Sequence, residues 1–216
     1  MKRMENKAII SVQNIDFSYG SQKILNDFST DFEQGSFTCI LGESGSGKST
    51  LLRIINGLLI PQSGVVKIED EVLSSVNLIQ KRLEMGYVLQ GNSLFPHLTV
   101  FQNMAYCLKL LKKSDIFCKE KIIQLLPLVG LKEDLLGKFP DEISGGQKQR
   151  VGIIRAIAHD PKIVLMDEPF SALDSETRDK LQILVKDIHQ KLKTTFVMVT
   201  HSKEEAEILA TQILQL

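Results

Sequence analysis

A short glycine-rich segment constrains this chain more than any other part of its sequence. Residues 42–49 are Gly-Glu-Ser-Gly-Ser-Gly-Lys-Ser, which fits the pattern G-x-x-x-x-G-K-[ST]. An apolar run at residues 35–41 precedes the segment, and apolar residues at helical spacing follow it from Leu51. A strand, a glycine loop and a helix in this order bring backbone amides together around phosphate oxygens. The segment therefore predicts an α/β fold that binds a nucleotide.

The residue types in this loop suit phosphate chemistry. Glycine lets the backbone approach a phosphate, Lys48 neutralises the outer phosphates, and the Ser49 hydroxyl can bind Mg²⁺. The alternative is a chance glycine turn before a helix. A dinucleotide fingerprint is excluded, because its third glycine is missing. The nucleotide contacts that we predict in the loop are Gly42, Ser44, Gly45, Ser46, Gly47, Lys48, Ser49 and Thr50.

The order of apolar segments predicts one α/β unit with an inserted helical part. At 216 residues the chain is long for one small domain and short for two. Strand patterns fall at residues 8–12, 35–41, 65–68, 86–89, 163–166 and 195–199. Helical periodicity dominates from about residue 99 to residue 131 and returns from Ser144 to the Asp160-Pro161 pair. We therefore expect a helical insertion at about residues 91–158.

Charge and cysteine content exclude several classes of protein. Lysine and arginine number 26, as do aspartate and glutamate, so no nucleic-acid partner is expected. Three cysteines without C-x-x-C spacing argue against disulfides and zinc, and favour a reducing cytosol. We expect the Cys39 thiol to be buried. The sequence contains neither a signal-peptide pattern nor a good membrane span.

Two acidic residues follow the apolar strand at residues 163–166. Ligands of open α/β sheets bind at the carboxyl ends of the strands, which is where Asp167 and Glu168 fall. Asp167 would hold Mg²⁺, directly or through water, and Glu168 would polarise the attacking water. The alternative is a solvated acidic turn favoured by Pro169.

The segment Ser144-Gly145-Gly146-Gln147 has two interpretations. Its S-x-x-Q spacing fits a capping box, in which serine and glutamine satisfy each other's backbone amides. A cap does not explain two glycines, because glycine within a helix costs up to about 1 kcal/mol relative to alanine. A bare helix N-terminus could instead bind an anion. The pattern by itself does not decide between the two.

Several segments together resemble the ABC ATPase family. Ile143-Ser-Gly-Gly-Gln147 resembles the LSGGQ signature, with isoleucine in place of leucine, and it lies between the phosphate loop and the acidic strand. Ser171-Ala-Leu-Asp174 resembles the D-loop, and a lone Gln90 follows a strand as in the family. His201 resembles the switch histidine, and Tyr19 is placed like the adenine-stacking aromatic residue. The resemblance runs from about residue 8 to the C-terminus.

The resemblance implies roles for these residues. The ligands would be ATP and Mg²⁺, with Ser49, Gln90 and Asp167 at the metal. Glu168, His201 and Gln90 would be catalytic, with His201 at the γ-phosphate. Tyr19, Asp174 and the residues from Ser144 to Gln147 would contact ATP. Tyr19 could instead pack at a strand end, and Gln90 could be an ordinary polar loop residue.

The resemblance also implies a fold, which is a P-loop NTPase (RecA-like) α/β core with a mostly parallel sheet. An N-terminal antiparallel β-subdomain and an inserted α-helical subdomain would complete it. The ATP-binding core would comprise residues 1–90 and 159–216, and the helical subdomain with the signature residues 91–158. The chain stops at Leu216, where many relatives continue, so no regulatory tail is expected.

The partners implied are a second copy of the chain and the permease subunits of a transporter. Two chains would dimerise head to tail, so that each ATP lies between one phosphate loop and the other chain's Ser144–Gln147 segment. Residues 93–100, 139–147 and 165–174 look most like bacterial importers, nearest to the osmoprotectant group (glycine betaine, choline, proline). A solute-binding protein would act indirectly, and the chain would lie in the cytoplasm against the membrane's inner face. A soluble ABC ATPase without a transport role and a nucleotide-binding regulatory module are the alternatives.

Overall fold

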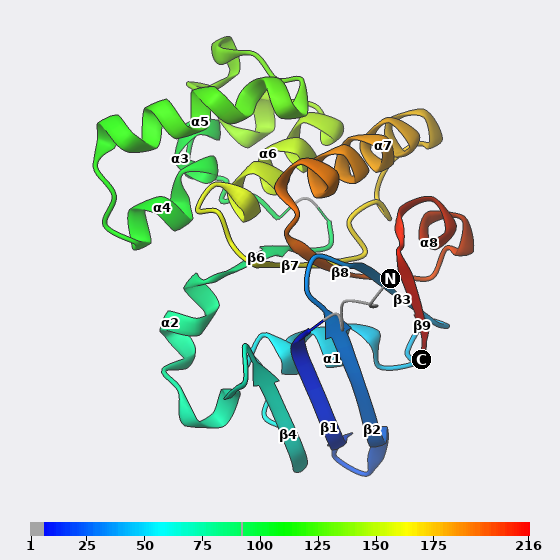
Figure 1. The fold of residues 1–216 in the computed structure, drawn as a ribbon. Helices are drawn as coiled ribbons and strands as arrows, with labels where there is room; N and C mark the ends of the chain where they lie inside the picture. Colours follow the sequence, from blue (N-terminus) through cyan, green and yellow to red (C-terminus); the bar gives the residue numbers. More distant parts are fainter. Residues whose placement is uncertain (1–6, 92) are drawn as a thin grey trace, which may run out of the picture. The chain divides into compact units, whose positions relative to one another are not determined.

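The computed structural model of the chain describes residues 7–91 and 93–216, which form two compact units (Figure 1). Residues 7–82 and Lys193–Leu216 make up the first unit, and Leu83–Leu192 make up the second. The chain therefore builds most of the first unit, then the whole second unit, and returns to complete the first.

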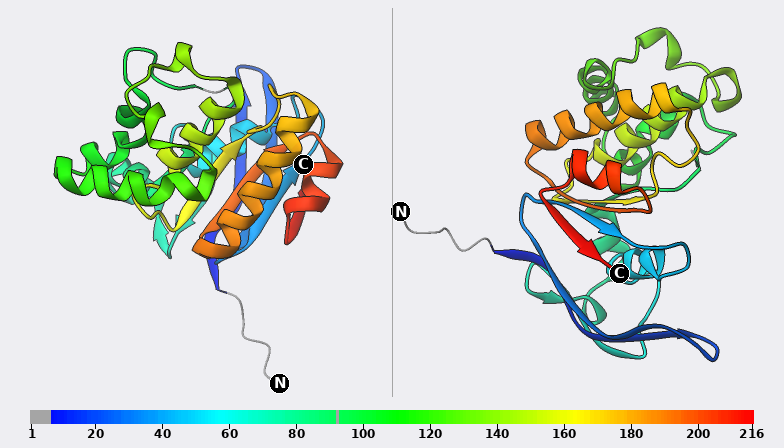
Figure 2. Two further views of the ribbon diagram at one scale, coloured as in Figure 1. Left: turned by 90° about the horizontal axis from the view of Figure 1, so that it is seen from above. Right: turned by 90° about the vertical axis from the view of Figure 1, so that its right-hand side faces the viewer.

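An antiparallel sheet begins the first unit. The strands β1 (Ala8–Tyr19) and β2 (Gln22–Glu33) form a long hairpin (Figure 2). On its other side β1 pairs with β4 (Ser63–Ile68), which pairs with the short β5 (Glu71–Val72). The prediction of a strand at residues 8–12 was too short, and β2 was missed. Most side chains of β2 are at least partly exposed, so its sequence lacks the apolar alternation that marks a strand.

Three parallel strands form the second layer of this unit. The order is β8 (Thr195–Thr200), β3 (Phe37–Leu41) and β9 (Gln212–Gln215). Every residue of β3 and β8 is buried, as expected of central parallel strands. Cys39 lies in this core, where burial raises the pKa of its thiol to about 12. The predicted structural role of Cys39 is confirmed.

The helices of the first unit are short. Helix α1 (Lys48–Ile55) follows β3, and α8 (Lys203–Leu209) lies between β8 and β9. The 3₁₀ turn η1 (Leu73–Ser75) and helix α2 (Leu78–Leu83) lead towards the second unit. The apolar face of α1 is buried through Leu51, Leu52 and Ile55, as its helical spacing predicted.

The second unit combines two parallel strands with most of the helices. Strands β6 (Met85–Val88) and β7 (Ile163–Asp167) pair in parallel. Between them come α3 (Val100–Met104), α4 (Tyr106–Leu110), α5 (Asp115–Val129), the turns η2 (Glu133–Leu135) and η3 (Pro140–Glu142), and α6 (Gly145–Ile157). Helix α7 (Ser175–Leu192) follows β7 (Figure 1).

Helix α6 packs closely on β6 within this unit. A Cβ atom at Gly86 would lie 2.2 Å from the backbone oxygen of Ala156, so β6 and α6 can approach only over a glycine. The N-terminus of α6 is the Ser144 segment, and Gln90 lies two residues after the end of β6. The contact between β6 and α6 therefore holds Gln90 and the Ser144 segment, both predicted site residues, on two elements that pack together.

No helix in the described part of the chain is long and apolar enough to cross a membrane.

Adding a methyl group at Gly86 should destabilise the second unit. We expect Gly86→Ala to lower the free energy of unfolding by about 1–3 kcal/mol, because the backbone carbonyl of Ala156 cannot rotate away. The matched control is Gly152→Ala in α6, where a Cβ meets nothing within 4 Å and should stabilise the helix by up to about 1 kcal/mol. Urea unfolding of both variants measures the difference. Equal stability of the two would contradict the packing described.

Candidate functional site

The glycine loop joins β3 to α1 in the first unit. The loop runs from Gly42, directly after β3, to Lys48, the first residue of α1. Gly45 and Gly47 have φ angles of 83° and 101°, which favour glycine, and Gly47 is the N-cap of α1. The predicted order of strand, glycine loop and helix is confirmed.

The side chain of Lys48 folds back onto its own loop. It is only 4% exposed, and its Nζ donates to the carbonyl oxygens of Gly42 (2.8 Å) and Glu43 (2.6 Å). The buried Ser46 Oγ has no hydrogen-bond partner in the described part of the chain. A buried cation and a buried hydroxyl at one helix N-terminus suit an anionic ligand.

Tyr19 lies at the end of β1 and keeps much of its ring accessible. The side chain is 45% exposed and meets Phe17 edge to face, with ring centroids 4.9 Å apart. The hairpin that carries Tyr19 lies beside the glycine loop, since the Ile24 side chain of β2 approaches Gly47. An exposed aromatic face near a phosphate site is suited to stacking on a base.

His201 follows β8 at the same sheet edge as the glycine loop. Leu41 of β3 pairs with Thr200 of the parallel strand β8. Gly42 and His201 follow this pair directly, so both lie beyond the same sheet edge. The Thr200 hydroxyl donates to the Glu205 carboxylate at 2.5 Å and accepts the Ser202 amide at 3.0 Å. Sequence reasoning missed Thr200 and Glu205. The S-x-x-E spacing of Ser202 and Glu205 was the available signal, although Glu205 bonds to Thr200.

The acidic strand and Gln90 come together in the second unit. Val88 pairs with Met166, so Gln90 and Glu168 each lie two residues beyond that pair. The Gln90 Nε2 donates to the Glu168 Oε2 at 3.1 Å. Asp167 is 4% exposed, whereas Glu168 is half-buried and has a φ angle of 41°, which is rare for a residue with a side chain. Such strained geometry is common at functional sites.

The Ser144 segment caps α6, which is one of the two interpretations that the sequence left open. The Ser144 Oγ accepts the Gln147 amide, and the Gln147 side chain accepts the Ser144 amide at 2.9 Å. Ser144 and Gly145 nevertheless remain exposed. The capping interpretation is therefore correct, and it leaves this helix N-terminus accessible.

Asp174 lies beside this segment in the same unit. Its carboxylate accepts the Thr177 amide at 2.9 Å at the start of α7, and this hydrogen bond lowers the pKa of Asp174. A polar hollow of about 490 Å³ connects the two segments. Its lining includes Ser144, Gly145, Gly146, Gln147, Asp174 and Lys180.

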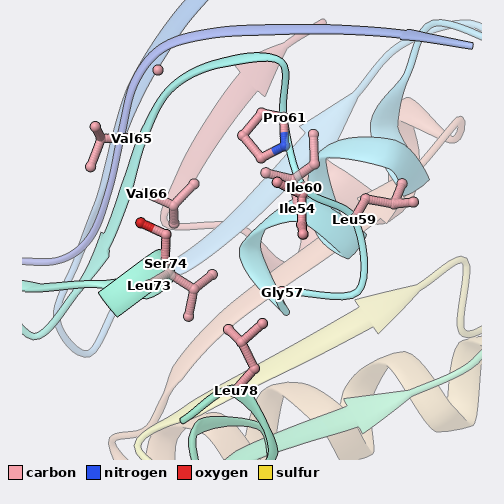
Figure 3. Close-up of a pocket in the computed structure, with 11 residues that line it drawn as sticks. Ile54, Gly57, Leu59, Ile60, Pro61, Val65, Val66, Leu73, Ser74 and Leu78 are labelled. Atoms are coloured by element: carbon pink, nitrogen blue, oxygen red, sulfur yellow. The ribbon is translucent and has the colours of Figure 1, made fainter. Parts of the chain in front are cut away.

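A second hollow, in the first unit, has a different character. This cavity of about 260 Å³ is lined mainly by apolar side chains from α1, β4, η1 and their connections (Figure 3). It contains no predicted site residue and no charged side chain. It is therefore unsuited to a nucleotide phosphate.

The predicted site residues thus form three groups. The glycine loop, Tyr19 and His201 belong to the first unit. Gln90, Asp167 and Glu168 form one group in the second unit, and Ser144–Gln147 with Asp174 form another.

Comparison with known proteins decides the family. Residues 25–171 match the ABC transporter family. The chain is 50% identical to the ergothioneine transport ATP-binding protein EgtV of Helicobacter pylori, over 97% of this chain and 98% of EgtV. It is 42% identical to the glycine betaine uptake system ATP-binding protein YehX of Escherichia coli, covering 95% of this chain and 67% of YehX. The chain belongs to the ABC transporter family.

Solved structures agree with this assignment. An ATP-binding cassette in a dimeric post-hydrolysis state, bound to ADP and phosphate, matches with a TM-score of 0.84 and 32% identity, covering 96% of this chain and 94% of that one.

The chain spans about half the length of a further sequence relative, the glycine betaine/carnitine/choline transport ATP-binding protein OpuCA of Bacillus subtilis, at 43% identity over 90% of this chain. The predicted P-loop NTPase fold and the prediction of an ABC-type ATP hydrolase of the transport class are confirmed.

Loss of the Thr200 hydroxyl should disturb the turn that carries His201. We expect Thr200→Val to destabilise the protein by about 1–3 kcal/mol, because it leaves the buried Glu205 carboxylate without this donor. Thr200→Ser keeps the hydroxyl and is the matched control. Thermal unfolding compares the two, and a Thr200→Val protein as stable as Thr200→Ser would contradict the role of this bond.

Proposed function

We propose that the chain is the ATP-hydrolysing subunit of a bacterial importer and works as a head-to-tail dimer on its permease. One observation supports a role in transport most directly. The relative at 50% identity, which this chain matches over nearly the full length of both, is named as the ATP-binding protein of a transport system. As such a subunit, the chain would lie on the cytoplasmic side of the membrane.

Within this proposal the first unit binds the triphosphate. The loop amides and Lys48 would bind the phosphates, Tyr19 would stack on adenine, and His201 would contact the γ-phosphate. The position of His201 directly after β8, the strand that pairs with β3, supports that role. The full set of loop contacts would be the eight residues predicted from the sequence.

Magnesium suits the oxygen donors among the predicted site residues. Ser49 offers a hydroxyl, Gln90 an amide oxygen and Asp167 a carboxylate, which are the ligand types that Mg²⁺ prefers. The bound ion would neutralise charge on the phosphates. The burial of Asp167 at the end of β7 supports a role in binding a cation over a solvated acidic turn.

We assign the attacking water to Glu168. A carboxylate at this position can orient the water and accept its proton. The hydrogen bond from Gln90 holds one Glu168 oxygen, which restricts the orientation of the side chain. Gln90 lies two residues after the end of β6, so movement at β6 would reach the catalytic carboxylate through Leu89 and the Gln90 hydrogen bond.

The exposed Ser144 segment would act on the ATP of a second copy. Its accessible amides and the adjacent Asp174 border one polar hollow, into which the partner's nucleotide would fit. A dimer of identical chains would then contain two complete sites. The solved dimeric cassettes support this arrangement.

Permease docking would involve the helical part at residues 91–158, with residues 1–90 and 159–216 as the ATP-binding core. Hydrogen bonds from within the unit hold residues 93–98: the buried Asn103 side chain bonds the backbone of Phe95 and Leu98, and Arg155 donates to the Ser93 carbonyl. Pro96 and His97 remain exposed on it. A rigid segment with exposed side chains is suited to bind a partner's helix.

An apolar surface in the first unit supports a second contact with the permease. Ile60 is 79% exposed and Leu58 is also exposed, and Ile60 borders the apolar cavity of Figure 3. Exposed apolar residues beside an open apolar hollow indicate protein contact. The solute itself would be selected by the permease and a solute-binding protein, since relatives of 41–43% identity serve choline, carnitine and sulfate transport by name.

Glu168→Gln should stop hydrolysis while ATP still binds. We expect turnover to fall at least about 100-fold, because the amide cannot accept a proton from the water. The variant should form a stable dimer with ATP, measured by size-exclusion chromatography. Glu207→Gln, at an exposed residue on α8, is the matched control. Unchanged phosphate release by Glu168→Gln would refute the assignment and favour another base.

A charge at Ile60 should uncouple the subunit from its permease. With the permease in nanodiscs, Ile60→Asp should reduce permease-stimulated ATP turnover at least about tenfold, because a carboxylate would be desolvated in the contact. The ATPase activity of the isolated chain should not change. Ile213→Asp, at another exposed isoleucine (52%), is the matched control. Equal stimulation of both variants would exclude this surface.

A further inference from the structure

Gly146 has no conformational need to be glycine. It lies in the first turn of α6, and its φ angle is not among the positive values of the described residues. Alanine has a higher helix propensity than glycine at such a position. The capping box of Ser144 and Gln147 would also accept alanine there, because it uses only the cap and third residues. Some other contact must therefore account for this glycine.

The contact comes from α7 of the same chain. A Cβ atom at Gly146 would lie 2.8 Å from the Thr177 Cγ2. This distance is well inside the separation of about 3.5–4.0 Å at which carbon atoms attract each other. The Thr177 methyl group therefore rests against the bare backbone of Gly146.

Thr177 cannot easily move aside. Its side chain is half-buried and β-branched, which limits its rotamers in a helix. Its amide donates to the Asp174 carboxylate at 2.9 Å, which ties its backbone to the turn before α7. Asp174, Thr177 and Gly146 thus form a continuous series of contacts between the two edges of the polar hollow.

We propose that Thr177 is a positioning residue for ATP-dependent dimerisation. Its methyl group sets the spacing between the N-terminus of α6 and the Asp174 turn, so that both edges of the hollow meet the partner's nucleotide together. Gly146 is glycine because this methyl group occupies the space of its side chain. The inference rests on the proposed role of the Ser144–Gln147 segment.

Steric rescue tests the contact. We expect Gly146→Ala to reduce ATP turnover at least fivefold, and the double variant Gly146→Ala/Thr177→Ser to return to within twofold of Thr177→Ser alone. Serine keeps the hydroxyl and removes the methyl group that collides. In the double variant Gly146→Ala/Thr177→Val the methyl group stays, so activity should not return. Near wild-type turnover of Gly146→Ala, or no recovery with serine, would overturn the proposal.

A thermal melt of each protein shows whether Gly146→Ala folds. If it does not, single variants of Thr177 test the proposal. In the Glu168→Gln background, Thr177→Ser should raise the ATP concentration for half-maximal dimerisation at least threefold, and Thr177→Val should raise it less. Equal values for Thr177→Ser and its parent would overturn the proposal. By contrast, wild-type turnover of Ser144→Arg would refute the proposed role of the segment itself, whatever the Thr177 variants do.

Discussion

The turn between β3 and α1 depends on the Lys48 ammonium group, which donates to the carbonyl oxygens of Gly42 and Glu43. A buried cation needs such partners, because an unpaired charge in the interior is costly. The chain reverses through the left-handed Gly47 to start α1, so the lysine and the helix N-terminus face one small region. The proposed phosphate site depends on that local arrangement.

Parallel pairing then determines which side chains gather at the ends of the strands. In the first unit the pairing of Leu41 with Thr200 puts the loop and His201 at one edge. In the second unit the pairing of Val88 with Met166 puts Gln90 against Glu168. Residues distant in sequence become neighbours because parallel strands end at the same sheet edge. The site residues therefore depend on strand register as much as on their own identity.

How far the sequence predicts this protein depends on how local each signal is. The glycine loop and the buried strand before Asp167 were predicted correctly, because each depends on a few adjacent residues. The Ser144 cap was one of two interpretations that the sequence left open, and the structure shows it. Strand β2 was missed, since most of its side chains are partly or fully exposed. Strand β9 was missed too, because only Ile213 and Leu214 of its four residues are apolar. The contact between Gly146 and Thr177 could not be predicted, because it joins residues from different helices through a single methyl group.

The central claim is that Ser144 of one chain acts on ATP held by Lys48 of another. A mixed dimer tests it directly: one chain carries Lys48→Ala, the other carries Ser144→Arg, and both carry Glu168→Gln so that ATP is retained. If the sites are shared, Lys48 of the Ser144→Arg chain and Ser144 of the Lys48→Ala chain form one intact site, so the mixed dimer should retain one ATP. Each homodimer of the same variants should retain none. Radiolabelled ATP held per dimer after gel filtration is the measurement. No ATP in the mixed dimer would show that each site is built within one chain and would contradict the account.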